Sequence, residues 1–490
     1  MTDRRNGRTP EIRTCPYVKK CGGCRTIGQP YEETLRKKRA YVTKLLAPYG
    51  KVEGIAGMED PYHYRNKVHA VFAHVWDGRR ERNIAGIYRE GTHKVVSVDS
   101  CLIEDGRAHP IIRDVLRLLP SFKWKVYDED SGYGLIRHIL IRTAHSTGQI
   151  MVVLVTASPM LPGKSHFVKE LVRLHPEITT IVQNVNPKKT TMVLGERESV
   201  AYGKGYIEDE LLGKTYRISA KSFYQINSLQ TEVLYRKALE FAGLTGRERV
   251  VDAYCGIGTI ALSAADRAAE VTGVELNAQA VRDAKWNAKR NGADNVQFLQ
   301  GDAGRFLTEQ VRSGKRADVI FMDPPRSGST EEFLLAAHAA GPKRIVYISC
   351  EPETLARDLA FLKNLGWKAV RIAAVDMFPF TEDIETCVLL VRESISDDEM
   401  VSIKVDLDGI ALDQGRYVPP EKPTYKNIKQ WISDKYGFNV STLYIAQIKD
   451  KVGMEKRKNY NPGSGEGRVP VCPPEKEEAI MDAFRHFDLI

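Results

Sequence analysis

The sequence lacks any hydrophobic segment long enough to cross a membrane. Its longest apolar run is IMVVLVTA at residues 150–157, far shorter than the ~20 apolar residues that a membrane-spanning helix requires. The first residues, MTDRRNGRTPEIRTCP, are polar and contain no apolar core of a secretory signal peptide. We therefore expect a soluble, cytoplasmic protein whose eight cysteines are mostly reduced or bound to metal.

Neither sign of charge dominates the sequence. There are 72 Lys and Arg against 63 Asp and Glu, a net charge of +9. This modest excess is compatible with an anionic partner but does not identify one. The length of 490 residues predicts roughly two to four domains, and the absence of internal repeats argues against a repeat architecture.

The residue pattern divides the chain into regions. An N-terminal segment, residues 1–105, carries four of the cysteines and merges into a β-rich central region, residues 51–215. Strands and helices alternate over residues 216–394, which predicts a mainly parallel sheet with crossover helices. A polar linker follows at residues 395–420, and a basic helical module occupies residues 421–490.

A glycine-rich turn marks a candidate cofactor site. The stretch VVDAYCGIGTIAL is a strand, a turn with Gly256 and Gly258, and a helix start. Acidic Glu275 ends the next strand, where a carboxylate can bind both hydroxyls of a ribose. NAD and S-adenosylmethionine (SAM) sites share this pattern, and a tight turn followed by an ordinary surface Glu is the alternative interpretation.

The end of a later strand favours SAM over NAD. The stretch FMDPPRSG places Asp323 before two prolines, which form a stiff loop and orient the carboxylate. A dehydrogenase has no use for such a loop, whereas methyltransferases that act on planar bases often contain one.

Cys350 lies where a core strand meets a helix, in RIVYISCEPETLARDL. The position is close to the positive end of the helix, where a thiolate is favoured. The alternative is a small buried hydrophobic residue, which is the usual role of a free cysteine.

Three cysteines crowd the N-terminus with the spacing C-x5-C-x2-C, and a fourth follows alone at residue 101. Four thiolates bind either zinc or an iron–sulfur cluster, and the spacing does not choose between them. The candidate ligands are Cys15, Cys21, Cys24 and Cys101.

Several stretches in one order resemble a known family. SFYQIN, DAYCGIGTIAL, MDPPRSG, YISCEPETLARDL and DIETCVLLVRE look like motifs of the SAM-dependent RNA uracil-5-methyltransferases, specifically the bacterial 23S ribosomal RNA branch. The resemblance covers roughly residues 10–394. It implies a Rossmann-like class I methyltransferase domain, a central RNA-binding domain and an N-terminal iron–sulfur segment that act on RNA. The small helical C-terminal module has no counterpart in the family pattern. We see no sign of an obligate protein partner and expect a monomer.

The resemblance also assigns roles to individual residues. It implies SAM contacts from Gln225, Tyr254, Glu275 and Asp323 beside the two glycines, with Asp302 near the adenine. It implies a [4Fe–4S] cluster on the four N-terminal cysteines, where spacing alone left zinc open.

The same resemblance implies covalent catalysis. A thiolate of Cys350 adds to C6 of the uracil, which gives C5 the electron density to take the methyl group. Glu385 then removes the C5 proton, and elimination frees the cysteine. The chain departs from the family pattern at Thr259, at Asp383 and Ile384, and in having no room before Cys15 for the small β-barrel found in many relatives.

Three other functions compete with this interpretation. The same chemistry on the T-loop uridine of transfer RNA is the main alternative. An RNA-binding or folding factor with incidental methylation is the second. An NAD oxidoreductase is the third, and it would leave Asp323 and Cys350 without a role.

The C-terminal module suggests a further contact with RNA. Residues 424–458 contain eight Lys or Arg against three acids, and apolar residues recur at helical spacing on either side of Gly437. We expect a pair of short helices that grips RNA phosphates. A solvated appendage or a protein-docking module is the alternative.

Overall fold

The computed structural model describes residues 11–76, 78–189, 192–392, 425–436, 438, 440–452 and 472–486. The chain divides into two compact units, Met1–Asp398 and Glu399–Ile490. Within the described ranges, every helix is too short or too polar to span a bilayer.

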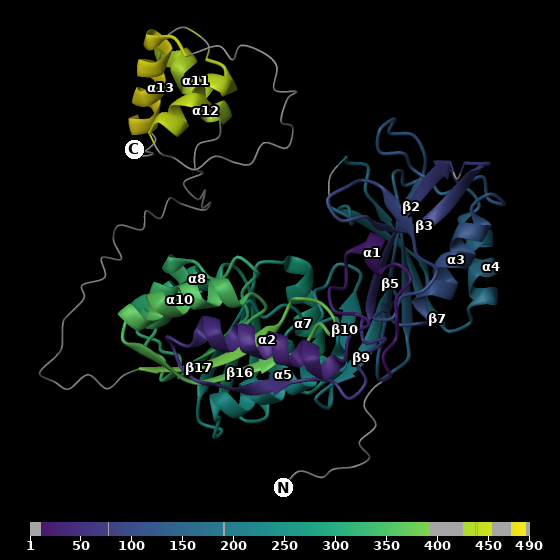
Figure 1. Cartoon of the computed structure of the whole chain (residues 1–490). Coiled ribbons are helices and arrows are strands. Elements are labelled where there is room, and N and C mark those ends of the chain that lie inside the picture. The colour runs from purple at the N-terminus through teal and green to yellow at the C-terminus, as the bar shows by residue number, and fades with distance from the viewer. Residues whose placement is uncertain are drawn as a thin grey trace, which may run out of the picture. The chain divides into compact units, whose positions relative to one another are not determined.

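The larger unit contains an eight-stranded sheet with the strand order β1-β16-β17-β15-β14-β11-β12-β13 (Figure 1). The five strands from β13 to β15 are parallel, whereas β17 runs antiparallel between β15 and β16. The strand bounds are β1 (Val52–Ala56), β11 (Arg249–Ala253), β12 (Glu270–Glu275), β13 (Val296–Gln300), β14 (Val319–Met322), β15 (Arg344–Ser349), β16 (Trp367–Val375) and β17 (Glu385–Arg392).

Helices cover both faces of this sheet, because its strands are apolar on both sides and need cover above and below. One face packs against α5 (Ser228–Ala242), α6 (Thr259–Ala265) and α7 (Ala278–Arg290). The other packs against α2 (Tyr31–Leu46), α8 (Ala303–Arg312), α9 (Glu331–Ala339) and α10 (Pro352–Asn364). The predicted α/β class, with crossover helices between parallel strands, is therefore confirmed.

The edge strand of the large sheet comes from the N-terminal part of the chain. β1 lies inside the range predicted as the central β-rich region, yet it pairs in parallel with β16, with Val52 opposite Ile372. The helix before it, α2, buries Val42 and Leu46 in the same core. A pairing between segments about 300 residues apart leaves no local signal in the sequence.

A second, seven-stranded sheet has the order β4-β3-β2-β5-β6-β7-β8, and a β9–β10 hairpin lies beside it. Helices α3 (Ala108–Leu118) and α4 (Lys164–Leu174) cover one face (Figure 1). The opposite face shares a core with the hairpin and with α5. The bounds are β2 (Lys67–Trp76), β3 (Glu81–Tyr88), β4 (Val95–Ser97), β5 (Ile136–Thr143), β6 (Ile150–Thr156), β7 (Ile178–Val185), β8 (Arg197–Tyr202), β9 (Tyr206–Leu211) and β10 (Lys214–Ser219). A short helix, α1 (Val18–Cys21), precedes α2.

The smaller unit contains three described helices, α11 (Tyr425–Tyr436), α12 (Thr442–Lys451) and α13 (Pro474–His486). Ile428, Ile432 and Ile448 are buried in its core. Gly437, the expected helix stop, lies outside the described residues.

The charge of the smaller unit is more balanced than its first half suggests. Acids on α13 pair with lysines of the other two helices, Asp482 with Lys435 and Glu477 with Lys451. Over residues 421–490 there are twelve Lys or Arg against ten Asp or Glu. Binding of RNA phosphates by this module stays a prediction, and the nearly balanced charge of the whole module supports it less than the charge of residues 424–458 alone.

A buried ion pair joins α2 to the loop that precedes β17. Lys38 Nζ donates to Asp376 Oδ1 at 2.6 Å, and the two side chains are 6% and 0% exposed. Lys38 Nζ also donates to the carbonyls of Phe378 (3.0 Å) and Asp383 (2.6 Å). Tyr31 Oη donates to the second carboxylate oxygen of Asp376 at 2.8 Å. The 376–384 loop is therefore fixed by side chains from the N-terminal helix.

Replacing Lys38 with Met should leave the buried carboxylate of Asp376 without its counter-charge. Breaking one side of such a pair typically costs about 3–5 kcal/mol. We expect Lys38→Met to lower the free energy of unfolding by this amount in urea denaturation, and Lys38→Met with Asp376→Asn to recover much of it. The matched control is Arg36→Gln on the exposed face of α2. A Lys38→Met protein as stable as this control would contradict the prediction.

Candidate active site

The predicted site residues gather at one edge of the large sheet. Asp323 and Cys350 directly follow β14 and β15, and Glu275 ends β12. Because carboxyl ends of parallel strands meet at a common edge, these side chains share it. Glu385 begins β17, and since β17 runs antiparallel to β15, its first residue lies at the same edge.

The turn after β11 has the backbone that its glycines allow. Gly256 and Gly258 have φ of +55° and +85°, a region that favours glycine. A Cβ on Gly258 would lie 2.5 Å from the ring of Phe298, so only glycine fits there. Tyr254 has φ of +66° without being glycine, which is uncommon. The turn is thus held in a conformation that brings its backbone amides to the sheet edge.

Glu275 is oriented by the backbone around it. Gly256 N donates to its Oε2 at 3.1 Å and Asn277 N donates to its Oε1 at 2.7 Å. Each carboxylate oxygen can accept more than one hydrogen bond. The fixed carboxylate therefore retains the capacity to accept from two hydroxyls of a ribose.

Asp302 serves as the N-cap of α8, where its Oδ1 accepts from Arg305 N at 2.9 Å. The ring of Tyr254 packs against Phe333 with 5.2 Å between centroids. Leu276, directly after Glu275, is 66% exposed. The sequence interpretation did not single out Leu276, an apolar side chain exposed next to the acid that ends β12.

Gln225 is buried in the loop between β10 and α5. The seven-stranded sheet holds this loop: Asn66 Nδ2 donates to the Gln225 carbonyl at 2.9 Å, and Arg142 donates to the carbonyls of Ala220 and Ser222. Phe223, in the same loop, is 64% exposed. The sequence interpretation quoted the SFYQIN stretch without singling out this exposed aromatic ring.

Cys350 and Glu385 meet through strand register. Ser349 on β15 pairs with Thr386 on β17, so the next residues along this antiparallel pair are Cys350 and Glu385. Glu385 is 2% exposed, and its Oε2 has no hydrogen-bond partner in the part of the chain that the structure describes. Burial, and then the charge of Asp323, raise the pKa of Glu385 well above its usual value. An unpartnered buried carboxyl is thus placed beside the thiol.

The electrostatics of Cys350 differ from the expectation of a favoured thiolate. Burial, and then the charges of Glu385 and Asp323, raise the pKa of Cys350 to about 12, and Arg326 opposes the shift. Arg326 lies 2.7 Å from Asp383 in an ion pair. Neighbouring carboxylates and desolvation outweigh the helix end, so the thiol is protonated in the free protein.

Burial also raises the pKa of Asp323. The edge therefore holds one thiol and two carboxyls that favour their neutral forms. A cationic ligand beside Asp323 and Glu385 would lower the pKa of these carboxyls and favour their ionised forms. The arrangement suits a positively charged cofactor and a reaction with a nucleophile and a base.

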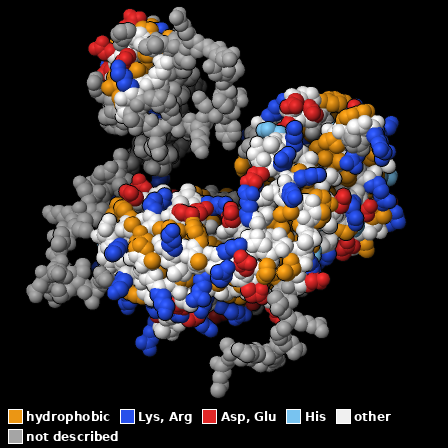
Figure 2. Space-filling model, in the orientation of Figure 1, with side chains coloured by type: hydrophobic (Ala, Val, Ile, Leu, Met, Phe, Trp, Pro, Cys, Tyr) orange, Lys and Arg blue, Asp and Glu red, His pale blue; other side chains and the backbone are white. Residues whose placement is uncertain are grey.

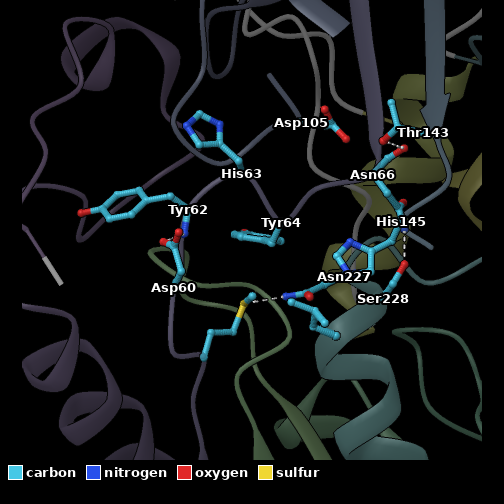
Figure 3. A pocket seen from close by; sticks show the side chains of 12 residues that line it. Asp60, Tyr62, His63, Tyr64, Asn66, Asp105, Thr143, His145, Asn227 and Ser228 are labelled. Atoms are coloured by element: carbon cyan, nitrogen blue, oxygen red, sulfur yellow. Dashed lines mark hydrogen bonds between the residues drawn. The ribbon is translucent and has the colours of Figure 1, made fainter. Parts of the chain in front are cut away.

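A pocket of about 160 Å³ is lined by residues at the end of the Gln225 loop and the start of α5, together with residues that precede β2 (Figure 3). Asn66, Asn227 and Ser228 form the wall next to the loop, and Asn66 Nδ2 donates to Ser228 Oγ at 3.1 Å. The remaining lining residues are Met58, Asp60, Tyr62, His63, Tyr64, Asp105, Thr143, His145 and Leu229. Neither Cys350 nor Glu385 lines it, so this cavity is a neighbour of the candidate active site rather than its centre.

The four N-terminal cysteines lie in one neighbourhood as half-buried free thiols. Burial raises the pKa of Cys24 to about 12, and the charges of Cys21 and Cys15 add to the shift. Burial and then Glu104 raise the pKa of Cys101 to about 12, with Cys24 contributing. Gly23 N lies 3.4 Å from Cys21 Sγ, the kind of amide-to-sulfur contact found in iron–sulfur proteins.

The donor set fits a four-thiolate centre, but the side chains are not arranged as one. Among the described residues, no group of three or more Cys, His, Asp or Glu is close enough to hold a metal ion. The metal centre therefore stays a prediction.

Comparison with known proteins agrees with this geometry. A family model described as tRNA (Uracil-5-)-methyltransferase matches residues 191–393. A protein named "Uncharacterized RNA methyltransferase" from Halalkalibacterium halodurans is 43% identical over 77% of this chain and 82% of its own length. A like-named protein from Clostridium acetobutylicum is 43% identical over 77% of this chain and 83% of its own.

A solved structure extends the likeness to the fold. The tRNA (uracil-54, C5)-methyltransferase of Pyrococcus abyssi, in complex with S-adenosyl-L-homocysteine, has a TM-score of 0.63 and 27% identity. It covers 78% of this chain and 88% of its own.

The raised pKa of Cys350 should be visible in its alkylation by iodoacetamide. At pH 8 we expect Cys350 to be alkylated roughly 30- to 100-fold more slowly in the folded protein than in the urea-unfolded chain. The low thiolate fraction slows the reaction, and the greater reactivity of a more basic thiolate offsets part of this effect. Arg326→Gln should slow it further, because Arg326 lowers this pKa. Mass spectrometry of the Cys350 peptide measures the rate, and Lys343→Gln, exposed at the far end of β15, is the control. Equal rates in folded and unfolded protein would contradict the prediction.

Proposed function

Because the chain belongs to the family of SAM-dependent RNA uracil-5-methyltransferases, we propose that it methylates C5 of a uridine in 23S ribosomal RNA through a covalent adduct. One observation carries the mechanistic part of this proposal: the register of β15 and β17 sets a thiol beside an unpartnered buried carboxyl at the cofactor edge. The presence of Cys15, Cys21, Cys24 and Cys101, which the resemblance assigns to an iron–sulfur cluster, is what favours the ribosomal RNA branch in this proposal.

Each step of the reaction has a residue suited to it. Cys350 Sγ forms a bond to C6, and the π electrons of the C5–C6 bond move toward the C4 carbonyl. When bound, SAM would supply an electrophilic methyl group to C5, with its S–CH3 bond breaking and the neutral thioether S-adenosyl-L-homocysteine as the leaving group. Glu385 then accepts the C5 proton, and the C6–S bond breaks to restore the double bond and the thiolate.

The raised pKa values suit this sequence once the site is filled. A carboxyl of high pKa is a stronger base than an exposed one when it is ionised. The free Oε2 of Glu385 has no hydrogen bond to give up before it takes the proton. Cys350, which is half-buried, must first lose its proton to solvent, and Arg326 is the nearby cation that favours this loss.

The target uridine must leave any helical stack before C6 can be reached. Phe223, exposed beside Gln225, offers an apolar ring on which an unstacked base can lie. Recognition of bases by aromatic stacking is common in proteins that bind single-stranded RNA.

Transfer RNA is the second candidate substrate, and the comparisons favour it in one respect. The family model and the Pyrococcus abyssi structure both carry tRNA in their names. The relatives that match most of the chain are named only as RNA methyltransferases. The cysteine cluster is therefore the feature that separates the two candidates.

Trapping with 5-fluorouridine tests the mechanism and the substrate together. Fluorine at C5 cannot leave as a proton, so the Cys350 adduct should accumulate with SAM present. We expect a slow-migrating band in denaturing gels with 5-fluorouridine-substituted 23S ribosomal RNA fragments and not with transfer RNA transcripts. Cys350→Ala should abolish it, and Glu385→Gln should accumulate adduct on ordinary RNA. Trapping that survives in the Ala variant would rule out the nucleophile, and a band with transfer RNA alone would favour the second candidate.

We also propose that Cys15, Cys21, Cys24 and Cys101 hold a [4Fe–4S] cluster. The segment that follows Cys24 is bonded to the loop before Glu385: Arg25 N and Thr26 N both donate to the Phe380 carbonyl, at 2.9 and 3.2 Å. A cluster there would fix this segment and, through Phe380, the approach to β17.

Anaerobically purified protein should be brown and contain about four irons per chain. Cys101→Ser should lose the iron and weaken RNA binding more than SAM binding. Because of the Phe380 contacts, it should also reduce turnover at saturating RNA. Iron analysis, visible absorption and calorimetry with SAM measure these effects, with Cys472→Ser in the smaller unit as control. Zinc in protein made with ample iron would contradict the cluster.

A further inference from the structure

Basic side chains line the start of β2 and the end of β5 on the face of the seven-stranded sheet that is turned away from α3 and α4. Lys67 pairs in register with Arg142. The ring of His69, two residues after Lys67, lies 5.1 Å from the ring of His138, four residues before Arg142. Arg65 precedes this set and donates from Nε to the Lys67 carbonyl at 3.3 Å. We call these five residues the basic ladder. Burial lowers the pKa of His69 to about 4 and that of His138 to about 3, so the charges of the ladder are those of Arg65, Lys67 and Arg142.

The ladder has little acidic compensation. In the described part of the chain, Lys67 Nζ has no hydrogen bond or ion pair with any carboxylate, and burial, Arg142 and Arg65 all lower the pKa of Lys67, to about 8. Arg142 is 3% exposed, and its Nε has no partner among the described atoms. Two acids lie close to the ladder, and each has another partner. Glu104 acts on His69, but its carboxylate is bonded to His109 Nε2 at 2.9 Å. Asp105, whose backbone N donates to the Arg65 carbonyl, forms an ion pair with Arg107 at 2.6 Å.

Two cations that face each other across paired strands repel, and burial weakens their hydration. Such a pair is costly unless an anion completes it. The lysine remains half-buried rather than closed off, so an anion can reach it from solvent.

The ladder lies directly beside the candidate active site. Asn66, next to Lys67, holds the Gln225 carbonyl, and Arg142 holds the carbonyls of Ala220 and Ser222. Elsewhere, on the face shown in Figure 2, Lys and Arg side chains are scattered among acidic and apolar ones.

We propose that the basic ladder binds a phosphate of the RNA backbone next to the target uridine, with Lys67 as the direct contact. This inference rests on the proposed function for the identity of its ligand. Lys67 and Arg65 contact the phosphate, and Arg142 is a positioning residue that supports Lys67 while holding the loop. The pocket in Figure 3, which has no Lys or Arg in its lining, is the adjoining space for an uncharged part of the nucleotide.

Lys67→Met tests the proposal, because it keeps the length of the side chain and removes the charge. The probe is a fluorescein-labelled RNA stem-loop with uridines in its loop, and binding is followed by anisotropy from 50 to 200 mM salt without SAM. One lost phosphate contact should reduce the slope of log K against log salt by about 0.7 and raise the Kd about fivefold at 0.1 M salt. Lys67→Arg should restore both.

The matched control is Lys169→Met, an exposed lysine on α4, on the far face of the same sheet. It removes the same charge and should leave the slope and Kd unchanged. The melting temperature of Lys67→Met should not fall, since a repulsion is removed, and its affinity for SAM should hold. Equal RNA binding by Lys67→Met and Lys169→Met overturns the proposal. The proposal is also overturned if Lys67→Met binds RNA more weakly only because its melting temperature has fallen.

Inorganic phosphate separates the two sources of such an anion. If 10 mM phosphate raises the melting temperature of the wild type and not of Lys67→Met, while RNA binding is equal in both, the ladder is a small-anion site and the RNA assignment is wrong. If Lys67→Met weakens RNA binding as expected but the wild type traps no 5-fluorouridine RNA, the ladder stands and the proposed methylation fails.

Discussion

The loop at residues 376–384 is the constraint on which the candidate active site depends. It enters β17, and β17 supplies Glu385 opposite Cys350. The buried Lys38–Asp376 pair fixes its start, and Tyr64 Oη and two backbone amides of the cysteine segment hold its middle. From α5, Gln230 Nε2 donates to the Asp376 carbonyl at 3.0 Å. A carboxyl that must stay buried and unpartnered needs such outside support, because its own hydrogen bonds do not position it.

The second element of the site, the loop at residues 220–227, is held from the other sheet. Arg142 and Asn66 grip it through its backbone carbonyls rather than its side chains. The two loops of the candidate site are thus held from different parts of the fold, one from α2, α5 and the cysteine segment and the other from the residue before β2 and the end of β5. The two sheets themselves share one core around Leu140, Tyr216 and Leu234.

What the sequence predicted well was local. The glycine turn, the Asp-Pro-Pro loop and the cysteine at a strand–helix junction depend on neighbouring residues, and their elements form where the patterns indicate. The thiol's raised pKa was not predictable in this way, because it arises from burial and from carboxyls on two other strands. The same is true of β1 at the edge of the large sheet and of Lys67 opposite Arg142, since strand pairing over long separations leaves no periodic signal. Leu276 and Phe223 stand next to motif residues in the sequence, but their exposure at the candidate site became evident only from the structure.

The electrostatics of the two loops complement each other. The sheet edge carries carboxyls that favour their neutral form until a cation arrives, whereas the basic ladder carries cations that repel until an anion arrives. Arg142 belongs to the ladder and also holds the loop that contains Gln225. An anion at Lys67 would ease the repulsion on Arg142 and so stabilise the conformation of that loop. By linkage, a ligand that orders the loop from the cofactor side must then favour the anion to the same degree. Cofactor and RNA would therefore strengthen each other's binding through one arginine, without any contact between them.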